Sequence, residues 1–137
     1  MHYWLIKSEP GNYSWQQFCK EGFAVWDGVR NFQARNNLRN MKLGDQVLFY
    51  HSGEGQEVVG IAKVVKEFYP DPTTGDSCWI VIEIAPVKPL KVPVKLKQIK
   101  SVKRLRNTTL VRQSRLSVMQ LTASQFNFIV HLGTHKK

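Results

Sequence analysis

Short apolar runs separated by turn residues place the strongest limit on how this chain of 137 residues can fold. Runs at 2–7, 46–50, 57–68 and 78–84 are bulky or β-branched and have the length of strands. Stretches at about 31–40 and 96–102 instead carry apolar residues at helical spacing. We therefore predict an α+β fold, a small mixed β-barrel with short helices packed around it. The pattern excludes a doubly wound sheet, whose strands alternate with longer crossover helices.

Capping and turn signals define the ends of these segments. Ser14–Gln17 and Thr122–Gln125 have the spacing of capping boxes, and each precedes a helical stretch that ends at a glycine, Gly22 or Gly133. Residues 53–55 join two strand runs into a hairpin, 70–76 form a loop, and 116–119 give a last strand. No repeat or linker interrupts the chain, so we predict a single domain over residues 1–137.

Charge is distributed very unevenly along the chain. The net charge is +10, and 12 of the 20 Lys and Arg residues follow Glu83, the last acidic residue. A basic region of this size favours a polyanionic partner, because Lys and Arg beside phosphates release condensed counterions. Nucleic acid is the partner we expect. An anionic membrane surface, or a basic charge that serves only solubility, is the alternative.

No segment predicts membrane insertion or secretion. The apolar runs are all shorter than a spanning helix, and residues 1–10 lack the basic start and the long apolar core of a signal peptide. We therefore expect an intracellular monomer, cytoplasmic in a bacterium or nuclear in a eukaryote. Cys19 and Cys78 lie far apart without a CxxC spacing, so both are expected to be reduced and structural.

Motifs for catalysis and for cofactor binding are absent from the sequence. There is no GxSxG, no HExxH, no phosphate loop and no GxGxxG. The ten carboxylates show no paired acid and base. We expect no catalytic residue, no metal and no cofactor, since metal-ligand spacing is also missing among the histidines, which are His2, His51, His131 and His135.

Residues 26–39, rich in aromatic, amide and guanidinium groups, are the strongest candidate for a binding site. Amides offer a donor and an acceptor together, which suits the edge of a nucleobase, and arginine suits phosphate. Trp26, just ahead of them, could supply a stacking face. The residues alone leave another interpretation open, in which Trp26 belongs to the core and the amides cap a helix.

Four blocks of sequence carry a family pattern: YWLIKSEP at 3–10, WDGVRN at the start of 26–36, VLFYHS at 47–52 and VGIA at 59–62. Together they resemble the EVE domain family of the PUA-like group, and the resemblance extends over about residues 1–133. It implies a PUA-like β-barrel related to YTH domains, which recognise methylated adenine in RNA within an aromatic pocket. It also implies a noncatalytic reader that flips a modified base, such as a modified cytosine in DNA, into such a pocket.

The resemblance also assigns roles to individual residues. Trp26 would stack on the base, Tyr50 would close the pocket, and Gly28 would let the backbone approach the ligand. Hydrogen bonds to the base edge would come from Ser8, Asn31 and Gln33. The complete set implied for the base pocket is Lys7, Ser8, Glu9, Pro10, Trp26, Gly28, Val29, Asn31, Gln33, Tyr50, His51 and Ser52.

Basic residues outside the pocket are expected to bind the nucleic-acid backbone. Arg115 lies in a late block, 112–118, that also resembles the family, whereas the lysine-rich span 88–106 could equally be a solvated face. Among the remaining tryptophans, Trp4 and Trp15 are expected in the core, and Trp79 too, although it could form a second wall of the pocket. The expected phosphate contacts are Arg30, Arg35, Lys95, Lys97, Lys100 and Arg115.

Two other functions remain open from the sequence. A general PUA-like RNA-binding module, serving tRNA or ribosomal RNA through shape and charge, would use the basic region and would need no base pocket. An enzyme acting on modified nucleic acid would use His51 and Glu9 as acid and base. His51 could instead be an interior residue that only makes a structural hydrogen bond.

Overall fold

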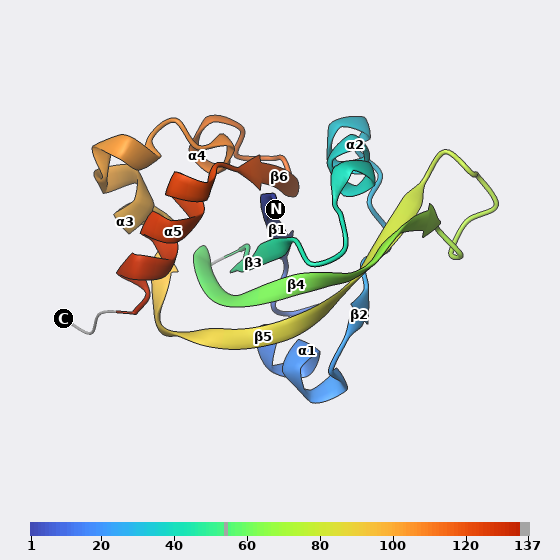
Figure 1. The fold of residues 1–137 in the computed structure, drawn as a ribbon, viewed down its shortest axis with the longest axis horizontal. Helices are drawn as coiled ribbons and strands as arrows, with labels where there is room; N and C mark the ends of the chain where they lie inside the picture. Colours follow the sequence, from blue (N-terminus) through green and yellow to red (C-terminus); the bar gives the residue numbers. More distant parts are fainter. Residues whose placement is uncertain (54, 135–137) are drawn as a thin grey trace.

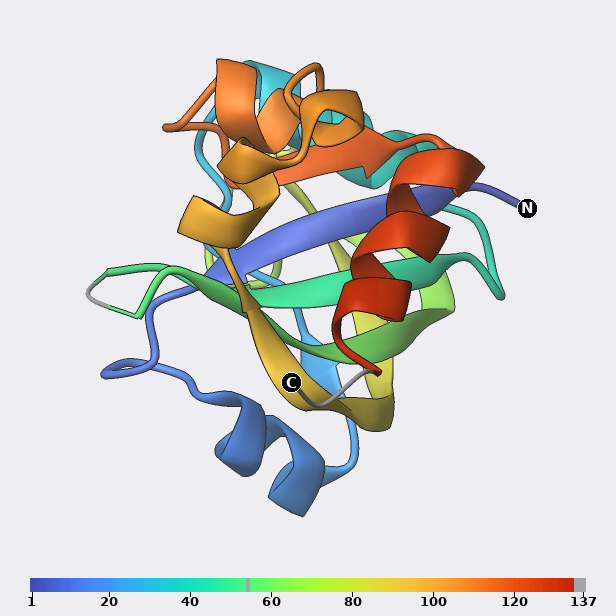
Figure 2. The same cartoon turned by 90° about the vertical axis from the view of Figure 1, so that its left-hand side faces the viewer.

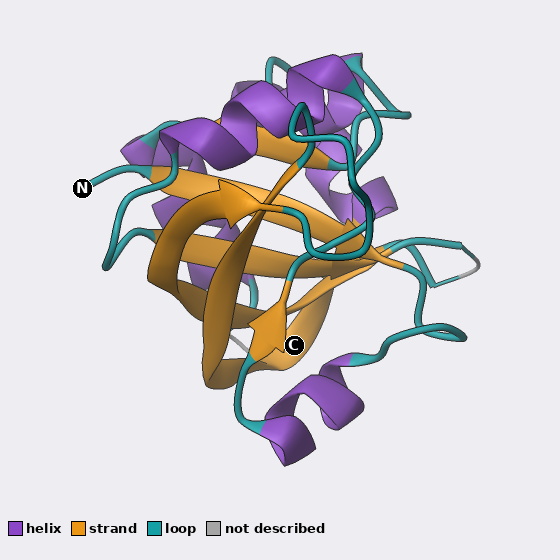
Figure 3. Ribbon diagram, turned by 90° about the vertical axis from the view of Figure 1, so that its right-hand side faces the viewer, coloured by secondary structure: helices purple, strands orange, loops and turns teal. Residues whose placement is uncertain are grey.

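The computed structural model describes residues 1–53 and 55–134. Within them, six strands form one strongly curved sheet in the order β2-β5-β4-β3-β1-β6, surrounded by five short helices and one 3-10 helix (Figures 1 and 3). The predicted α+β class, a small barrel with helices around it, is confirmed. Glu54, in the predicted turn at 53–55, and His135 lie outside the described residues.

One side of the sheet brings together strands from the beginning and the end of the described chain. β1 pairs in parallel with β3 on one side and antiparallel with β6 on the other (Figure 2). β3 and β4 form the predicted hairpin, β4 pairs with β5 over most of its length, and β2 adds to β5. The strands are β1 (Tyr3–Ser8), β2 (Ala24–Val25), β3 (Gln46–His51), β4 (Glu57–Pro70), β5 (Ile80–Lys95) and β6 (Val118–Leu121).

Strand β5 is longer than the predicted run at 78–84, because it continues through Pro86, Pro89 and Pro93. Proline cannot donate to a strand ladder, so these residues indicated the end of a strand. The strand tolerates them because β2 pairs with β5 only beside Glu83 and Ile84, which leaves the later half at an edge. Several register shifts in the pairing with β4 also accommodate them. The last predicted strand, 116–119, is displaced by two residues.

The two predicted capping boxes, at Ser14 and Thr122, both mark the start of a helix. Ser14 caps α1, and left-handed Gly22 ends it. Asn31 caps α2, and Thr122 and Gln125 form the complete capping box of α5. In the described part of the chain, every helix falls short of the length and apolar character that a membrane crossing requires. The helices are α1 (Trp15–Glu21), α2 (Phe32–Asn40), α3 (Leu96–Ser101), α4 (Thr109–Arg112) and α5 (Ala123–Leu132).

An aromatic cluster connects the core to the surface near β2. Trp4 and Trp15 are buried, as predicted, whereas Trp79, which was also expected in the core, is only half-buried and stacks on the exposed Phe32 ring. The Trp15 ring lies directly against Gly60 of β4, where a Cβ atom would overlap the ring. Phe49 is in edge contact with both Trp15 and Trp26, at centroid distances of 5.4 and 5.7 Å. The cluster therefore supports Trp26 from the core side.

Candidate nucleic-acid interface

A cavity of about 520 Å³ opens at the end of β1, beside the Trp26 segment. Its walls are formed by residues 7–9, 12 and 13, by residues 21 and 24–30, and by Ser117, so it brings together three separate parts of the chain. Its volume lies in the range of small-molecule sites. Of the residues implied for the base pocket, the cavity is lined by Lys7, Ser8, Glu9, Trp26, Gly28 and Val29.

Trp26 is half-buried and stands between the core and this cavity. Its backbone N–H donates to the Ile82 carbonyl at 2.8 Å, which fixes the segment to β5. Its ring contacts Phe49 on the core side and lies 6.2 Å from the Tyr13 ring in an edge arrangement. Core packing and cavity lining are therefore combined in Trp26, and Tyr13 also lines the cavity.

Tyr13 is a cavity residue that the sequence interpretation did not identify. Its hydroxyl donates to Glu21 Oε1 at 2.7 Å, and burial together with this hydrogen bond raises the pKa of the hydroxyl. The Tyr13 carbonyl accepts from the Ser8 hydroxyl, so the Ser8 proton is already bonded to the backbone. No local pattern marks Tyr13, because it reaches the cavity only through the turn between β1 and α1.

The cavity contains more carboxylates than cations. Glu9, Glu21 and Asp27 line it together with Lys7 and Arg30. Like charge disfavours a phosphate among these carboxylates, whereas their oxygens can accept N–H groups from the edge of a base. The cavity is therefore better suited to a base than to the nucleic-acid backbone.

Lys7 forms the boundary between this cavity and a second one. Its Nζ donates to the Ser114 carbonyl at 2.7 Å and lies 5.7 Å from the centre of the Tyr50 ring. Burial lowers the pKa of the Lys7 ammonium group. The contact with Ser114 fixes the position of this cation between the two spaces.

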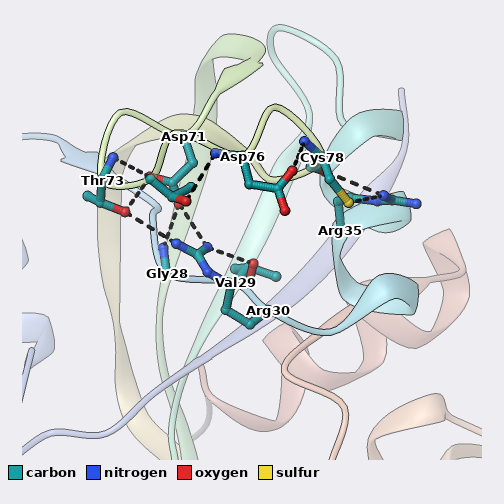
Figure 4. A network of polar contacts seen from close by, with 9 residues as sticks. Gly28, Val29, Arg30, Arg35, Asp71, Thr73, Asp76 and Cys78 are labelled. Carbon is teal, nitrogen blue, oxygen red and sulfur yellow. Dashed lines mark hydrogen bonds and ion pairs between the residues drawn. The ribbon is translucent and has the colours of Figure 1, made fainter.

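Arg30 is held by a buried carboxylate on the loop between β4 and β5 (Figure 4). Asp71 Oδ2 accepts from Arg30 Nη1 at 3.0 Å and from the Gly28 N–H at 3.1 Å. Burial raises the pKa of Asp71, but hydrogen bonds from Thr73, Gly28 and Arg30 outweigh this effect and lower it to about 2. Gly28 has a φ of 76°, which a residue with a side chain rarely adopts. The sequence marked 70–76 only as a loop, so the role of Asp71 was missed.

Arg35 is bound to the same loop. Its Nη1 lies 3.0 Å from Cys78 Sγ (Figure 4). Its Nη2 donates to Asn36 Oδ1 at 2.8 Å. Cys19 and Cys78 are both free thiols. Arg30 and Arg35 therefore connect the segment after Trp26 to the loop, in addition to any phosphate that they could contact.

Two smaller cavities continue from the first. The second, of about 290 Å³, shares Lys7 and Ser117 with it. The third, of about 340 Å³, shares Ser114 and Arg115 with the second. Five predicted residues therefore lie along this row and outside the Trp26 cavity: Tyr50 and Ser52 in the second cavity, Asn31 and Gln33 in the third, and Arg115 in both.

A capping bond in one case and burial in the other account for the positions of two of these residues outside the Trp26 cavity. The Asn31 side-chain oxygen accepts the Ala34 N–H at 2.9 Å, so it is used as the cap of α2. Tyr50 is buried under the second cavity, and burial raises the pKa of its hydroxyl to about 12. The alternative interpretation, that amides of this segment cap a helix, describes Asn31.

Pro10 and His51 do not line these three cavities. Pro10 lies in the turn that follows β1. His51 Nε2 accepts the backbone N–H of Trp15 at 3.0 Å. Burial lowers the pKa of His51, although the charges of Glu57 and Glu9 oppose this shift. A neutral His51 whose Nε2 lone pair is occupied holds the start of α1. The geometry therefore gives no support to His51 and Glu9 as an acid and base pair.

The predicted lysines lie on an exposed surface beside the second cavity. Lys95 ends β5, and Lys97 and Lys100 are exposed on α3, whose Ile99 is buried and whose Leu96 lines the second cavity. The predicted solvent side of this helix is confirmed.

Within residues 1–53 and 55–134, no three His, Cys, Asp or Glu side chains are grouped so that they could hold a metal ion.

The curved sheet, its strand order and its surrounding helices place the chain in the PUA-like class of small barrels. The model of the EVE domain family matches residues 2–132, almost the whole chain. This protein therefore belongs to the EVE domain family. The resemblance seen in the sequence is confirmed.

Similar proteins cover nearly all of the chain. Thymocyte nuclear protein 1 of Mus musculus is 36% identical over an alignment of 165 residues, gaps included. The alignment covers 96% of this chain and 73% of the mouse protein. The crystal structure of Atu2648 from Agrobacterium tumefaciens has a TM-score of 0.95 and 43% identity, covering 97% of this chain and 93% of that one. Human THYN1, solved in complex with 5-methylcytosine-containing DNA, has a TM-score of 0.92 and 31% identity, with complete coverage of both chains.

A more distant likeness concerns the fold alone. The YTH domain of Zygosaccharomyces rouxii MRB1, solved with N6-methyladenosine RNA, has a TM-score of 0.61 and 15% identity, covering 99% of this chain and 88% of that one. The structural relation to YTH domains that the sequence resemblance implied is thereby confirmed.

Proposed function

We propose that this protein is a noncatalytic reader of a modified base in nucleic acid and takes the flipped base into the cavity beside Trp26. The observation that carries the proposal is the position of Trp26, supported by Phe49 from the core and lining a cavity of about 520 Å³. The human relative solved with 5-methylcytosine-containing DNA supports nucleic acid as the ligand. A flipped base needs an aromatic surface and polar partners for its edge, and this cavity offers both.

Aromatic and acidic groups divide the recognition of the base between them. Trp26, with Tyr13 beside it, would contribute stacking, which is typically worth about 1–3 kcal/mol per base. Carboxylates of Glu9 and Asp27 would accept from an exocyclic amine. Both 5-methylcytosine and N6-methyladenine retain such an N–H group, so both are candidates. Lys7 would donate to an acceptor on the base.

Cations outside the cavity would bind the backbone of the same strand. Arg115 lines the second cavity, and the exposed lysines lie on α3, whose Leu96 also lines it. Asn31 and Gln33 would contact nucleotides next to the flipped one. We further propose that the protein acts as a monomer in the bacterial cytoplasm or, if it is eukaryotic, in the nucleus, as the name of the mouse relative supports.

The proposal is tested by fluorescence anisotropy at one fixed salt concentration. Matched DNA and RNA strands carry cytosine, 5-methylcytosine, 5-hydroxymethylcytosine, adenine or N6-methyladenine at one position. We expect at least tenfold tighter binding of one modified base, about 1.4 kcal/mol. Trp26→Ala should remove this discrimination, whereas Trp26→Phe, which keeps a ring, should retain part of it.

The same experiment includes a result against the proposal. Equal binding of all strands by the wild type, unchanged in Trp26→Ala, would favour the general RNA-binding module and its basic region. Circular dichroism and thermal unfolding of each variant serve as the control, because Trp26 also contacts Phe49.

A further inference from the structure

A second aromatic surface lies beside the cavity, where α2 meets the loop between β4 and β5. Phe32, the first residue of α2, stacks on Trp79 with ring centroids 5.1 Å apart and an angle of 24° between the rings. Phe32 nevertheless remains 61% exposed, so its neighbours leave much of the ring in water. Large exposed aromatic surfaces of this kind often mark an interaction site.

Arginines of α2 follow this pair along one side of the helix. Phe32, Arg35 and Arg39 are spaced three and four residues apart, which places them on one helix face. The Arg35 guanidinium lies 5.0 Å from the Phe32 ring, and that of Arg39 lies 5.8 Å from Phe68, which is 43% exposed. We call these residues, with Trp79, the Phe32–Trp79 surface.

The charge of this surface identifies its partner. Among the described residues, neither Arg35 nor Arg39 has a carboxylate within 4.0 Å. Asp76, an acidic residue of the adjoining loop, accepts the Cys78 N–H. Cations without acidic partners beside exposed rings match a single-stranded nucleic acid, whose phosphates are negative and whose bases stack on aromatic side chains.

The surface is held in place by the same bonds that form the wall of the cavity. Asp71 fixes Gly28 and Arg30, and Arg35 contacts Cys78, so the loop and the start of α2 are tied together (Figure 4). A surface already ordered in this way loses less entropy when a ligand binds.

Arg30 connects the two sites. It lines the cavity, and its guanidinium lies 5.5 Å from the Trp79 ring. The Phe32–Trp79 surface therefore begins at the rim of the cavity, one side chain away from a base held inside it.

We propose that the Phe32–Trp79 surface is a second subsite, on which the nucleotide next to the flipped base stacks as part of a single strand. Arg35 and Arg39 bind the phosphates of that strand. The inference rests on the proposed function, because the flipped base in the cavity fixes where the strand passes.

Two single-stranded probes of nine nucleotides test the subsite by fluorescence anisotropy. One carries the modified base between two normal nucleotides, and the other carries it between two abasic sites, which keep the phosphates but cannot stack. Wild-type protein should bind the first about fivefold or more tightly than the second, the lower end of a typical stacking contribution. Phe32→Ala should remove this advantage and leave the preference for the modified base intact. Trp26→Ala should remove the preference for the modified base and leave the advantage of the first probe intact.

Other variants make the result specific. Phe23→Ala is the matched control, because Phe23 is also exposed, at 52%, and lies outside this surface; it should bind both probes like the wild type. Phe32→Leu keeps an apolar side chain without a ring and should lose the advantage as Phe32→Ala does. Arg35→Gln should make the dependence of log K on log salt shallower by about 0.7.

Three results would contradict the subsite. The subsite is overturned if Phe32→Ala keeps the same ratio of affinities for the two probes as the wild type. It is also overturned if the wild type is a dimer in size-exclusion chromatography and Phe32→Ala is a monomer, because the surface would then bind a second copy of the protein. Binding of neither probe by the wild type would reject both the subsite and the proposed function. Equal binding of modified and plain bases, still weakened by Phe32→Ala, would reject the proposed function alone.

Discussion

Asp71 is the residue on which the wall of the cavity most depends. Its side chain has no exposed surface, and it bonds to Gly28 and Arg30, which lie more than 40 residues away in the sequence. A buried carboxylate is tolerated only when its oxygens are well bonded. Removing it would release the backbone between Trp26 and α2.

Asp71→Asn should reduce the free energy of unfolding at pH 7 by about 2 kcal/mol, the equivalent of lowering the carboxyl pKa from 3.8 to about 2. Because the pKa is lower in the folded state, the contribution is complete above pH 4 and is lost as the pH falls toward 2. The wild type should therefore lose stability in this window, and the variant should lose less. Urea unfolding of both proteins between pH 4 and pH 2 measures these free energies. If the free energy of unfolding falls with pH equally in the wild type and the variant, Asp71 does not contribute to the pH dependence.

Part of the cavity lining was predictable from the sequence. Trp26 was identified because an aromatic residue precedes a cluster of amides and arginines, and it lines the cavity. Asn31 belongs to the same cluster, but its oxygen caps α2, since residue type does not reveal which bond a side chain makes. Tyr13 and Asp71 could not be found, because only tertiary contacts bring them to the cavity.

At the scale of elements, local signals predicted most helix starts and the β3–β4 hairpin. They failed in β5, where the prolines at 86, 89 and 93 indicated the end of a strand. Whether a proline breaks a strand depends on which side of the strand is paired, and that is a property of the whole sheet. The glycine of the VGIA block at 59–62 also has a tertiary explanation, since Gly60 lies against the Trp15 ring.

Gly60→Ala should destabilise the protein by about 1–3 kcal/mol, because the added methyl group would force the Trp15 ring out of its position between α1 and β4. Gly75→Ala is the matched control, since a Cβ at that position meets nothing within 4 Å. Thermal and urea unfolding of the two variants give the comparison. Equal stability of the two would mean that the ring has room to shift.

Across the whole molecule, the charges that would attract nucleic acid lie apart from the cavity that would select a base. The cavity carries Glu9, Glu21 and Asp27, whereas the surplus of positive charge follows Glu83 in the sequence. Long-range attraction and recognition of the base can therefore be changed independently.

Replacing Lys95, Lys97 and Lys100 together by glutamine should weaken binding of modified and unmodified strands by the same factor. The slope of log K against log salt should become shallower by about 0.7 for each of these lysines that contacts a phosphate of a single strand. Anisotropy titrations at several salt concentrations measure both quantities. A change in the preference for the modified base would contradict the separation of the two functions.

The place of β1 between β3 and β6 has a consequence for how the protein is made. Lys7 and Ser117 line the same cavity and are joined by a backbone hydrogen bond of 2.9 Å, although 110 residues separate them. While the chain is being synthesised, β1 must wait for β6 to leave the ribosome before its second edge is paired. The cavity is therefore completed only after β6 has been synthesised, long after Trp26 and the rest of its wall.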